Sequence, residues 1–180
     1  MGSDQIYTKV LLTEKIYVNF SKLNSAIFNH LQSIITHKVE GICIDEGFVK
    51  PDSVKLVSHS SGELSADSVL FDIVYECLVA NTVESMELDC VVRSITKVGI
   101  RTEIDDAISP FVIFIARDHH FESAPYSDVN EGDIVRIRVL GQRYELNNKF
   151  ISVIAEFLHI NNYETSKAGL ADVSGDGDKE

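Results

Sequence analysis

Apolar and polar side chains alternate along the middle of the chain. Between Ser68 and Asn81 an apolar residue occupies every second position, namely Val69, Phe71, Ile73, Tyr75, Cys77 and Val79. Asp72 and Glu76 fall on the opposite face. A period of two predicts a long β-strand with one buried side. Ile6–Val18 mixes β-branched and aromatic residues with polar ones and predicts another extended strand.

The apolar spacing changes to three and four between these two strands. The apolar positions there are Leu23, Ile27, Phe28, Leu31, Ile34 and Ile35. This spacing predicts an amphipathic helix with Ser21 as its N-cap and an end near Gly41. The face of Leu23, Ile27, Leu31 and Ile34 is expected in the core. Residues 42–62 predict two strands around a turn that holds Gly47 and Pro51, and Ser58–Ser68 predicts a surface loop. The first domain is therefore expected to be α+β, with one helix on an antiparallel sheet.

Short strands alone are predicted after Met86. Their expected ranges are Leu88–Ile95, Gly99–Ile104, Phe111–Ile115, Ile134–Leu140 and Phe150–Phe157. Five short strands with a glycine bend in the second one predict a closed Greek-key barrel of the OB type. Residues 161–180 are polar and acidic and predict a disordered tail. The expected domains are residues 1–84, 85–160 and 161–180.

The charge balance limits how such a barrel could bind nucleic acid. The formal net charge is -12 and the isoelectric point is near 4.8, which excludes binding through a generally basic surface. All six arginines, however, lie between Arg93 and Arg143. Arginine suits phosphate pairing and base stacking, although strand surfaces also carry it without any such role. Contact with nucleic acid is therefore expected to be local.

The two barrel strands richest in charge place arginine on an outer face. Arg136 and Arg138 alternate with apolar residues that enter the core, and Arg101 alternates with Ile100 and Thr102. The stretch SITKVGIRTEI lacks the aromatic ring that many RNA-binding barrels carry after this glycine. We therefore expect a weak, sequence-tolerant path for single-stranded RNA over Arg101, Arg136, Arg138 and Lys97. The alternative is a solvated face with salt bridges to Glu103 and Asp133.

Further chemistry is sparse. Arg117, with Phe121 and Tyr126, belongs to a loop expected at the rim of the barrel, where it could approach RNA or simply pack. His119 and His120 have no third ligand at metal spacing, and no nucleophile, phosphate-loop or cofactor motif occurs. We expect neither a metal nor a cofactor nor an enzymatic activity.

Cysteine usage and hydropathy indicate the compartment. Cys43, Cys77 and Cys90 are widely spaced and are expected to be buried thiols in a reducing environment. No apolar run approaches the roughly 18 residues that a membrane span needs, and no signal peptide is recognised. The sequence predicts a soluble intracellular protein without membrane contact.

Four stretches resemble the larger stalk subunit of multisubunit DNA-directed RNA polymerases, which is the seventh-largest subunit in eukaryotes and has a direct archaeal counterpart. The stretches are VEGICIDEGFV (Val39–Val49), FDIVYECLVANTVESMELDCVV (Phe71–Val92), GDIVRIRVLGQR (Gly132–Arg143) and ISVIAEFL (Ile151–Leu158). Their order and spacing carry the resemblance, which runs from Tyr7 to His159. A shorter CIDEGF loop and the acidic tail indicate a divergent member, for which a large DNA virus with its own polymerase is the expected source.

This resemblance implies a tip domain that docks on the polymerase core, and we expect Glu40, Gly41, Gly47 and Phe48 to serve that docking. It also implies a barrel facing the exiting RNA, a smaller helical stalk subunit as partner, and a role in transcription initiation. The expected location is the nucleus for a cellular protein and the host cytoplasm or the virion for a viral one. Two alternatives stay open: a free-standing OB-fold RNA-binding protein in translation or RNA processing, and an assembly scaffold without nucleic-acid contact.

Overall fold

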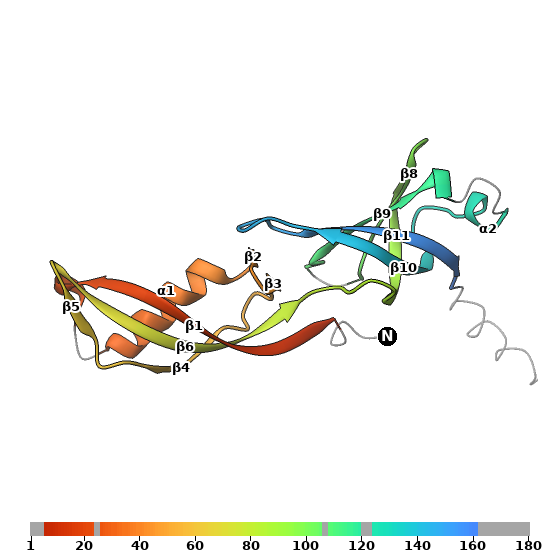
Figure 1. The fold of residues 1–180 in the computed structure, drawn as a ribbon. Helices are drawn as coiled ribbons and strands as arrows, with labels where there is room; N and C mark the ends of the chain where they lie inside the picture. Colours follow the sequence, from red (N-terminus) through yellow and green to blue (C-terminus); the bar gives the residue numbers. More distant parts are fainter. Residues whose placement is uncertain (1–5, 24–25, 106–107, 120–123, 162–180) are drawn as a thin grey trace, which may run out of the picture.

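Two long antiparallel strands form the spine of the N-terminal half (Figure 1). The computed structural model describes residues 6–23, 26–105, 108–119 and 124–161. β1 (Tyr7–Asn19) pairs with β6 (Ser68–Ala80) along its whole length, from Tyr7 opposite Ala80 to Asn19 opposite Ser68. Buried and partly exposed positions alternate along β6, which confirms the strand predicted from the period of two.

Four short strands complete this antiparallel sheet. They are β2 (Cys43–Ile44), β3 (Gly47–Val49), β4 (Lys55–His59) and β5 (Glu63–Ser65). The order is β1-β6-β3-β2, and β4 and β5 also pair with β6. The predicted loop at Ser58–Ser68 is wrong in part, because β5 lies inside it. Leu64 pairs with Val69 there although its side chain is 82% exposed, so no alternation of buried residues marked this strand in the sequence.

α1 (Ile27–Val39) covers one face of the sheet. Leu31, Ile35 and Val39 are buried in a cluster with residues of β1, β4 and β6, so the apolar spacing identified a real helix. The helix begins later than predicted, because Ser21 lies in the short 3-10 turn η2 (Phe20–Lys22).

Local hydrogen bonding explains the shifted start of the helix. The Asn19 side-chain oxygen accepts a hydrogen bond from the backbone N–H of Ser21 at 3.0 Å. This bond caps the 3-10 turn, so Ser21 does not serve as the N-cap of a longer helix. Ala26 occupies the N-cap of α1 without a side-chain cap. Leu23, expected in the core, is 37% exposed and lies before α1 begins. The predicted N-cap at Ser21 and the predicted burial of Leu23 are therefore wrong.

Five strands close a barrel in the C-terminal half. They are β7 (Glu87–Ile95), β8 (Gly99–Glu103), β9 (Phe111–Ala116), β10 (Ile134–Arg143) and β11 (Ile151–Ile160). The order around the barrel is β7-β8-β9-β11-β10, and β10 closes the barrel by pairing with β7. β9 and β11 run parallel while the other pairs are antiparallel. This arrangement fits the predicted OB-type barrel.

Two short helical turns lie between β9 and β10. They are η3 (Arg117–His119) and α2 (Ala124–Ser127). Tyr126 of α2 is 4% exposed and meets the Phe157 ring edge-on, with the ring centroids 5.9 Å apart. The predicted rim loop is therefore anchored in the barrel core at this tyrosine. Its residues His120 and Phe121, and Asp106 of the turn predicted at Asp105–Asp106, lie outside the described residues.

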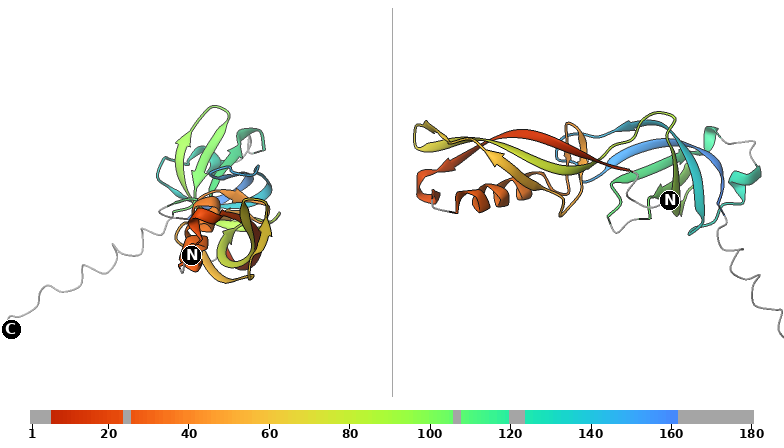
Figure 2. Two further views of the ribbon diagram at one scale, coloured as in Figure 1. Left: turned by 90° about the vertical axis from the view of Figure 1, so that its left-hand side faces the viewer. Right: turned by 90° about the horizontal axis from the view of Figure 1, so that it is seen from below.

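The two halves share one hydrophobic cluster, in which Ile6, Phe48 and Ala80 pack with the inward side chains of the barrel. The hairpin of β10 and β11 reaches back to the N-terminal sheet, and the molecule is elongated (Figures 1 and 2). The Cys43 N–H donates to the Asn148 carbonyl at 2.7 Å, and the Asn147 N–H donates to the Cys43 carbonyl at 2.9 Å. The domain boundary near residue 84 stays a prediction. Apart from Asn161, the expected tail lies outside the described residues.

Candidate nucleic-acid interface

The outer face of β8 and β9 carries an aromatic ring packed on a glycine. Arg101 pairs with Phe114 across the two strands, and Gly99 pairs with Ala116. The Phe114 side chain is partly exposed, and a Cβ atom at position 99 would lie only 2.6 Å from its ring carbon Cζ. Gly99 thus makes the space that the Phe114 ring occupies on this face. An outward aromatic face of this kind can stack on a base of single-stranded nucleic acid.

Two arginines beside this ring share one carboxylate. Arg101 Nη2 lies 2.8 Å from Glu103 Oε1, and Arg93 Nε of β7 lies 3.4 Å from Glu103 Oε2. The Arg101 and Arg93 side chains are 51% and 48% exposed, so both remain accessible from solvent. Two guanidinium groups against one carboxylate leave this ion-pair cluster with an excess of positive charge, which suits a phosphate.

The rim beside this face carries two more basic side chains. Lys97 and Val98 form the tip of the β7–β8 hairpin, which is closed by a hydrogen bond from the Thr96 N–H to the Gly99 carbonyl at 2.9 Å. The Arg117 N–H donates to the Val98 carbonyl at 3.1 Å, so the start of η3 lies against this hairpin. Lys97 and Arg117 are exposed. The structure therefore brings Lys97 and Arg101 to one end of the barrel with Phe114. Arg117 begins η3 beside the hairpin, and its side chain hydrogen-bonds Tyr126.

Arg136 and Arg138 belong to a different part of the barrel surface. Both lie on β10, on the far side of β7 from β8. Arg136 Nη1 lies 2.9 Å from Asp89 Oδ2 and its Nε lies 3.4 Å from Glu87 Oε2. Arg138 contacts Glu87 and Glu156, each at 3.4 Å.

These contacts separate the expected RNA path into two parts. On β10 two arginines meet three carboxylates, and the Arg136 side chain is only 20% exposed. Hydrogen bonding to Asp89 is the main cause that raises the pKa of Arg136. The expected salt bridge to Glu103 is formed by Arg101. The arginines of β10 pair with other carboxylates than Asp133, whose side chain accepts a hydrogen bond from the Asn130 N–H at 2.8 Å. The structure therefore places the residues of the expected path on two surfaces of the barrel, and RNA binding at either one stays a prediction.

Phe114 is a candidate residue that the sequence prediction missed. In the stretch FVIFIA, Phe111 and Phe114 are three positions apart and so must lie on opposite faces of a strand. Phe111 is fully buried, which places Phe114 outside. The signal was present in this spacing. The sequence prediction expected a ring only on the strand that carries Gly99, whereas the ring comes from the strand beside it.

The expected docking residues shape the turn between α1 and β3. Glu40 ends α1, and its carboxylate accepts from the Val54 N–H at 3.0 Å. Gly41 and Gly47 have φ values of 72° and 136°, which favour glycine. At Gly47 the Ala80 carbonyl also occupies the space that a side chain would need. Phe48 is 1% exposed and belongs to the shared core. These four residues therefore position the exposed β2–β3 turn, and Phe48 does not contribute contact surface itself.

Reactive and metal-binding groups do not gather at any of these surfaces within the described ranges. Cys43, Cys77 and Cys90 are free and buried, and burial raises the pKa of each thiol, to about 11 for Cys77 and about 12 for Cys90. Such thiols are poor nucleophiles at neutral pH. No group of three histidine, cysteine or carboxylate side chains suited to a metal occurs within the described residues. In the same ranges, every helix is too short or too polar to cross a bilayer.

Comparison with known proteins gives one informative likeness. The chain is 22% identical over 198 aligned positions to a protein of Acanthamoeba polyphaga mimivirus whose name reads "putative DNA-directed RNA polymerase subunit". The alignment covers 100% of this chain and 98% of the viral protein. No protein-family model matches the chain. The full-length likeness supports a role as a subunit of a DNA-directed RNA polymerase.

Proposed function

We propose that this chain is a non-catalytic stalk subunit of a DNA-directed RNA polymerase. The likeness to a viral polymerase subunit over both full lengths carries the proposal. The order of a helix-covered antiparallel sheet followed by an OB-type barrel supports it further, since the larger stalk subunits that the sequence resembles have a tip domain and an OB barrel in that order. In a virus-encoded polymerase the subunit would act in the host cytoplasm or the virion.

The two halves have separate tasks in this proposal. The N-terminal half docks on the polymerase core through the β2–β3 turn that Glu40, Gly41, Gly47 and Phe48 hold in place, and a smaller helical stalk subunit packs along the molecule. The barrel contacts exiting RNA during transcription initiation. Its β8–β9 face, with Phe114, Arg101 and the rim residues Lys97 and Arg117, is the surface for that RNA. Arg136 and Arg138 act mainly in the barrel's own ion pairs.

Native affinity purification tests the polymerase assignment. The full-length chain, tagged at its C-terminus, is expressed in the cells in which its polymerase assembles and is recovered at moderate salt. We expect the large catalytic subunits and one small helical protein in amounts equal to the tagged chain. A matched chain with Gly47→Val should lose them, because a side chain at position 47 would meet the Ala80 carbonyl at 2.3 Å. Recovery of RNA without any polymerase subunit would instead favour a free-standing RNA-binding protein.

A further inference from the structure

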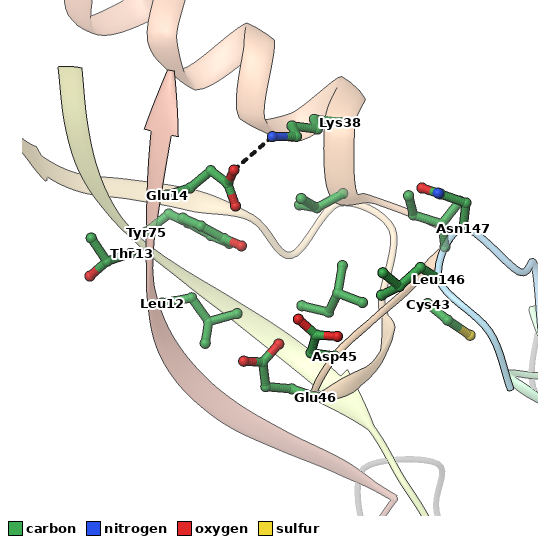
Figure 3. A pocket seen from close by; sticks show the side chains of 13 residues that line it. Leu12, Thr13, Glu14, Lys38, Cys43, Asp45, Glu46, Tyr75, Leu146 and Asn147 are labelled. Carbon is green, nitrogen blue, oxygen red and sulfur yellow. Dashed lines mark hydrogen bonds and ion pairs between the residues drawn. The ribbon is translucent and has the colours of Figure 1, made fainter. Parts of the chain in front are cut away.

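A cavity of about 320 Å³ lies between the helix side of the N-terminal sheet and the β10–β11 hairpin (Figure 3). β1, the last turn of α1, the β2–β3 turn, β6 and the hairpin loop all contribute to its wall. Leu12 and Leu146 line it with apolar surface, and Leu146 is 60% exposed. The cavity is of the size that holds a single long side chain of another protein.

The charged groups around this cavity are mainly acidic. Glu14 is neutralised by Lys38, with the Lys38 Nζ 2.7 Å from Glu14 Oε1. Asp45 and Glu46 are exposed at the β2–β3 turn and form no ion pair within the part of the chain that the structure describes. The last turn of α1 also lies here, and the C-terminal end of a helix carries partial negative charge. The cavity therefore favours a cation.

Tyr75 points its hydroxyl group into this cavity without a hydrogen-bond partner among the described residues (Figure 3). The residue as a whole is only 3% exposed, and its hydroxyl group lies where the cavity leaves it open to a partner. Burial raises the pKa of Tyr75, and negative charge at Cys77, Glu14 and Glu46 raises it further. A hydroxyl group that faces an acidic cavity can accept a hydrogen bond from a donor that also carries positive charge.

Tyr144 from the β10–β11 hairpin and Asn81 after β6 hold the acidic turn in place. The Tyr144 hydroxyl donates to the Asp45 carbonyl at 2.9 Å, and the Asn81 side-chain amide donates to the Glu46 carbonyl at 3.0 Å. Both contacts bind the backbone and leave the two carboxylates available. A partner would therefore meet a surface that is already ordered, which lowers the entropic cost of binding.

Arginine fits these features better than a metal ion. The described residues hold no set of three ligands for a metal. A guanidinium group has five donors in one plane and can reach two carboxylates and a hydroxyl at once, while its aliphatic stem packs on apolar surface such as Leu12 and Leu146. We propose that this cavity receives an arginine side chain, flanked by apolar residues, from another subunit of the polymerase. The identity of that partner rests on the proposed function.

A short peptide tests this site directly on the isolated full-length chain. The probe is acetyl-Leu-Arg-Leu-amide, titrated into the isotopically labelled protein while backbone amide shifts are followed by NMR. The control peptide carries citrulline, which has nearly the same shape as arginine but no charge. We expect saturable shifts at Asp45, Glu46 and Leu146 with the arginine peptide, and at least tenfold weaker binding of the citrulline peptide.

Two variants locate the binding. Asp45→Asn with Glu46→Gln should weaken the arginine peptide at least tenfold, whereas Glu63→Gln on β5, at the other end of the sheet, should leave it unchanged (Figure 1). Tyr75→Phe should weaken it two- to fivefold. Equal binding of the two peptides, shifts that map elsewhere, or unchanged binding by the double variant would each overturn the proposal. These outcomes concern the isolated chain, so they are independent of whether the affinity purification recovers a polymerase.

Discussion

β8 and β10 lie on either side of β7 in the barrel, and each presents arginine on its outer face. Around β8, Arg101 and Arg93 share the single carboxylate of Glu103. Along β10, two arginines are held among Glu87, Asp89 and Glu156. The same alternation of arginine with apolar residues thus gives a surface open to phosphate in one place and a closed ion-pair network in the other. The strands beside each arginine decide which one forms.

The glycines of the two strands should respond differently to the same substitution. Gly99→Ala is expected to lower the free energy of unfolding by about 3 kcal/mol, because its Cβ would lie 2.3 Å from the Ile115 carbonyl oxygen and would press on Phe114. Gly141→Ala on β10 meets nothing within 4 Å and should change it by less than about 0.5 kcal/mol. Urea unfolding followed by circular dichroism measures both. Equal effects would show that Gly99 is not packed as described.

Phe114 should distinguish the two faces in RNA binding. Phe114→Ala is expected to weaken single-stranded RNA about tenfold, since stacking one base on a ring contributes roughly 1–3 kcal/mol. Ile154→Ala on β11 is the matched control, because Ile154 pairs with Phe114 and is 54% exposed but has no ring. Fluorescence anisotropy with a labelled oligonucleotide measures the affinity. A similar loss in both variants would argue against stacking at Phe114.

Arg136 should matter more for stability than Arg101 does. Arg136→Gln removes the 2.9 Å contact to Asp89, whose side chain is 15% exposed, and is expected to cost about 1 kcal/mol in the free energy of unfolding. Arg101→Gln loses a contact at a half-exposed site and should cost less than about 0.5 kcal/mol. Chemical unfolding of both variants at low salt tests this order. The reverse order would remove the distinction between the two faces.

Salt dependence of RNA binding offers a smaller contrast between the same strands. Each phosphate contact with a single strand contributes about 0.7 to the slope of log K against log salt. Arg101→Gln should reduce the slope by about that amount, while Arg138→Gln should leave it unchanged because Glu87 and Glu156 already neutralise that guanidinium. Equal slopes for the two variants would contradict an open β8 face.

Cys90 of β7, the strand shared by both faces, gives an effect that is confined to alkaline pH. Burial raises the pKa of its thiol from 9.0 to about 12. A raised folded-state pKa stabilises the fold fully below pH 9, and this contribution is lost as the pH rises towards 12. We expect the free energy of unfolding to fall between pH 8 and pH 10, and less steeply in Cys90→Ala. The same pH dependence in both proteins would show that Cys90 is not its source.

Periodicity was enough to predict β6, the barrel strands and the existence of α1, because each buries every second residue or one helical stripe. It failed at β5, where Leu64 points into solvent, and at Ser21, where Asn19 provides a competing local hydrogen bond. The ion pairs of Arg101 and Arg136 could not be assigned from the sequence, since a single strand pattern does not reveal the carboxylates that neighbouring strands supply. The outward position of Phe114 could be read from its spacing to Phe111, but its place beside Arg101 and the Tyr75 cavity depend on contacts between elements.

Photo-crosslinking to nascent RNA most directly tests whether RNA meets the β8–β9 face of the barrel and not β10. p-Benzoylphenylalanine is placed at Val98, which is 69% exposed at the tip of the β7–β8 hairpin, or at Arg138 on β10, in the chain assembled with its polymerase. The enzyme then elongates a radiolabelled transcript before irradiation. The account predicts label on the chain from Val98 and little from Arg138. Stronger label from Arg138, or none from either position, would contradict it.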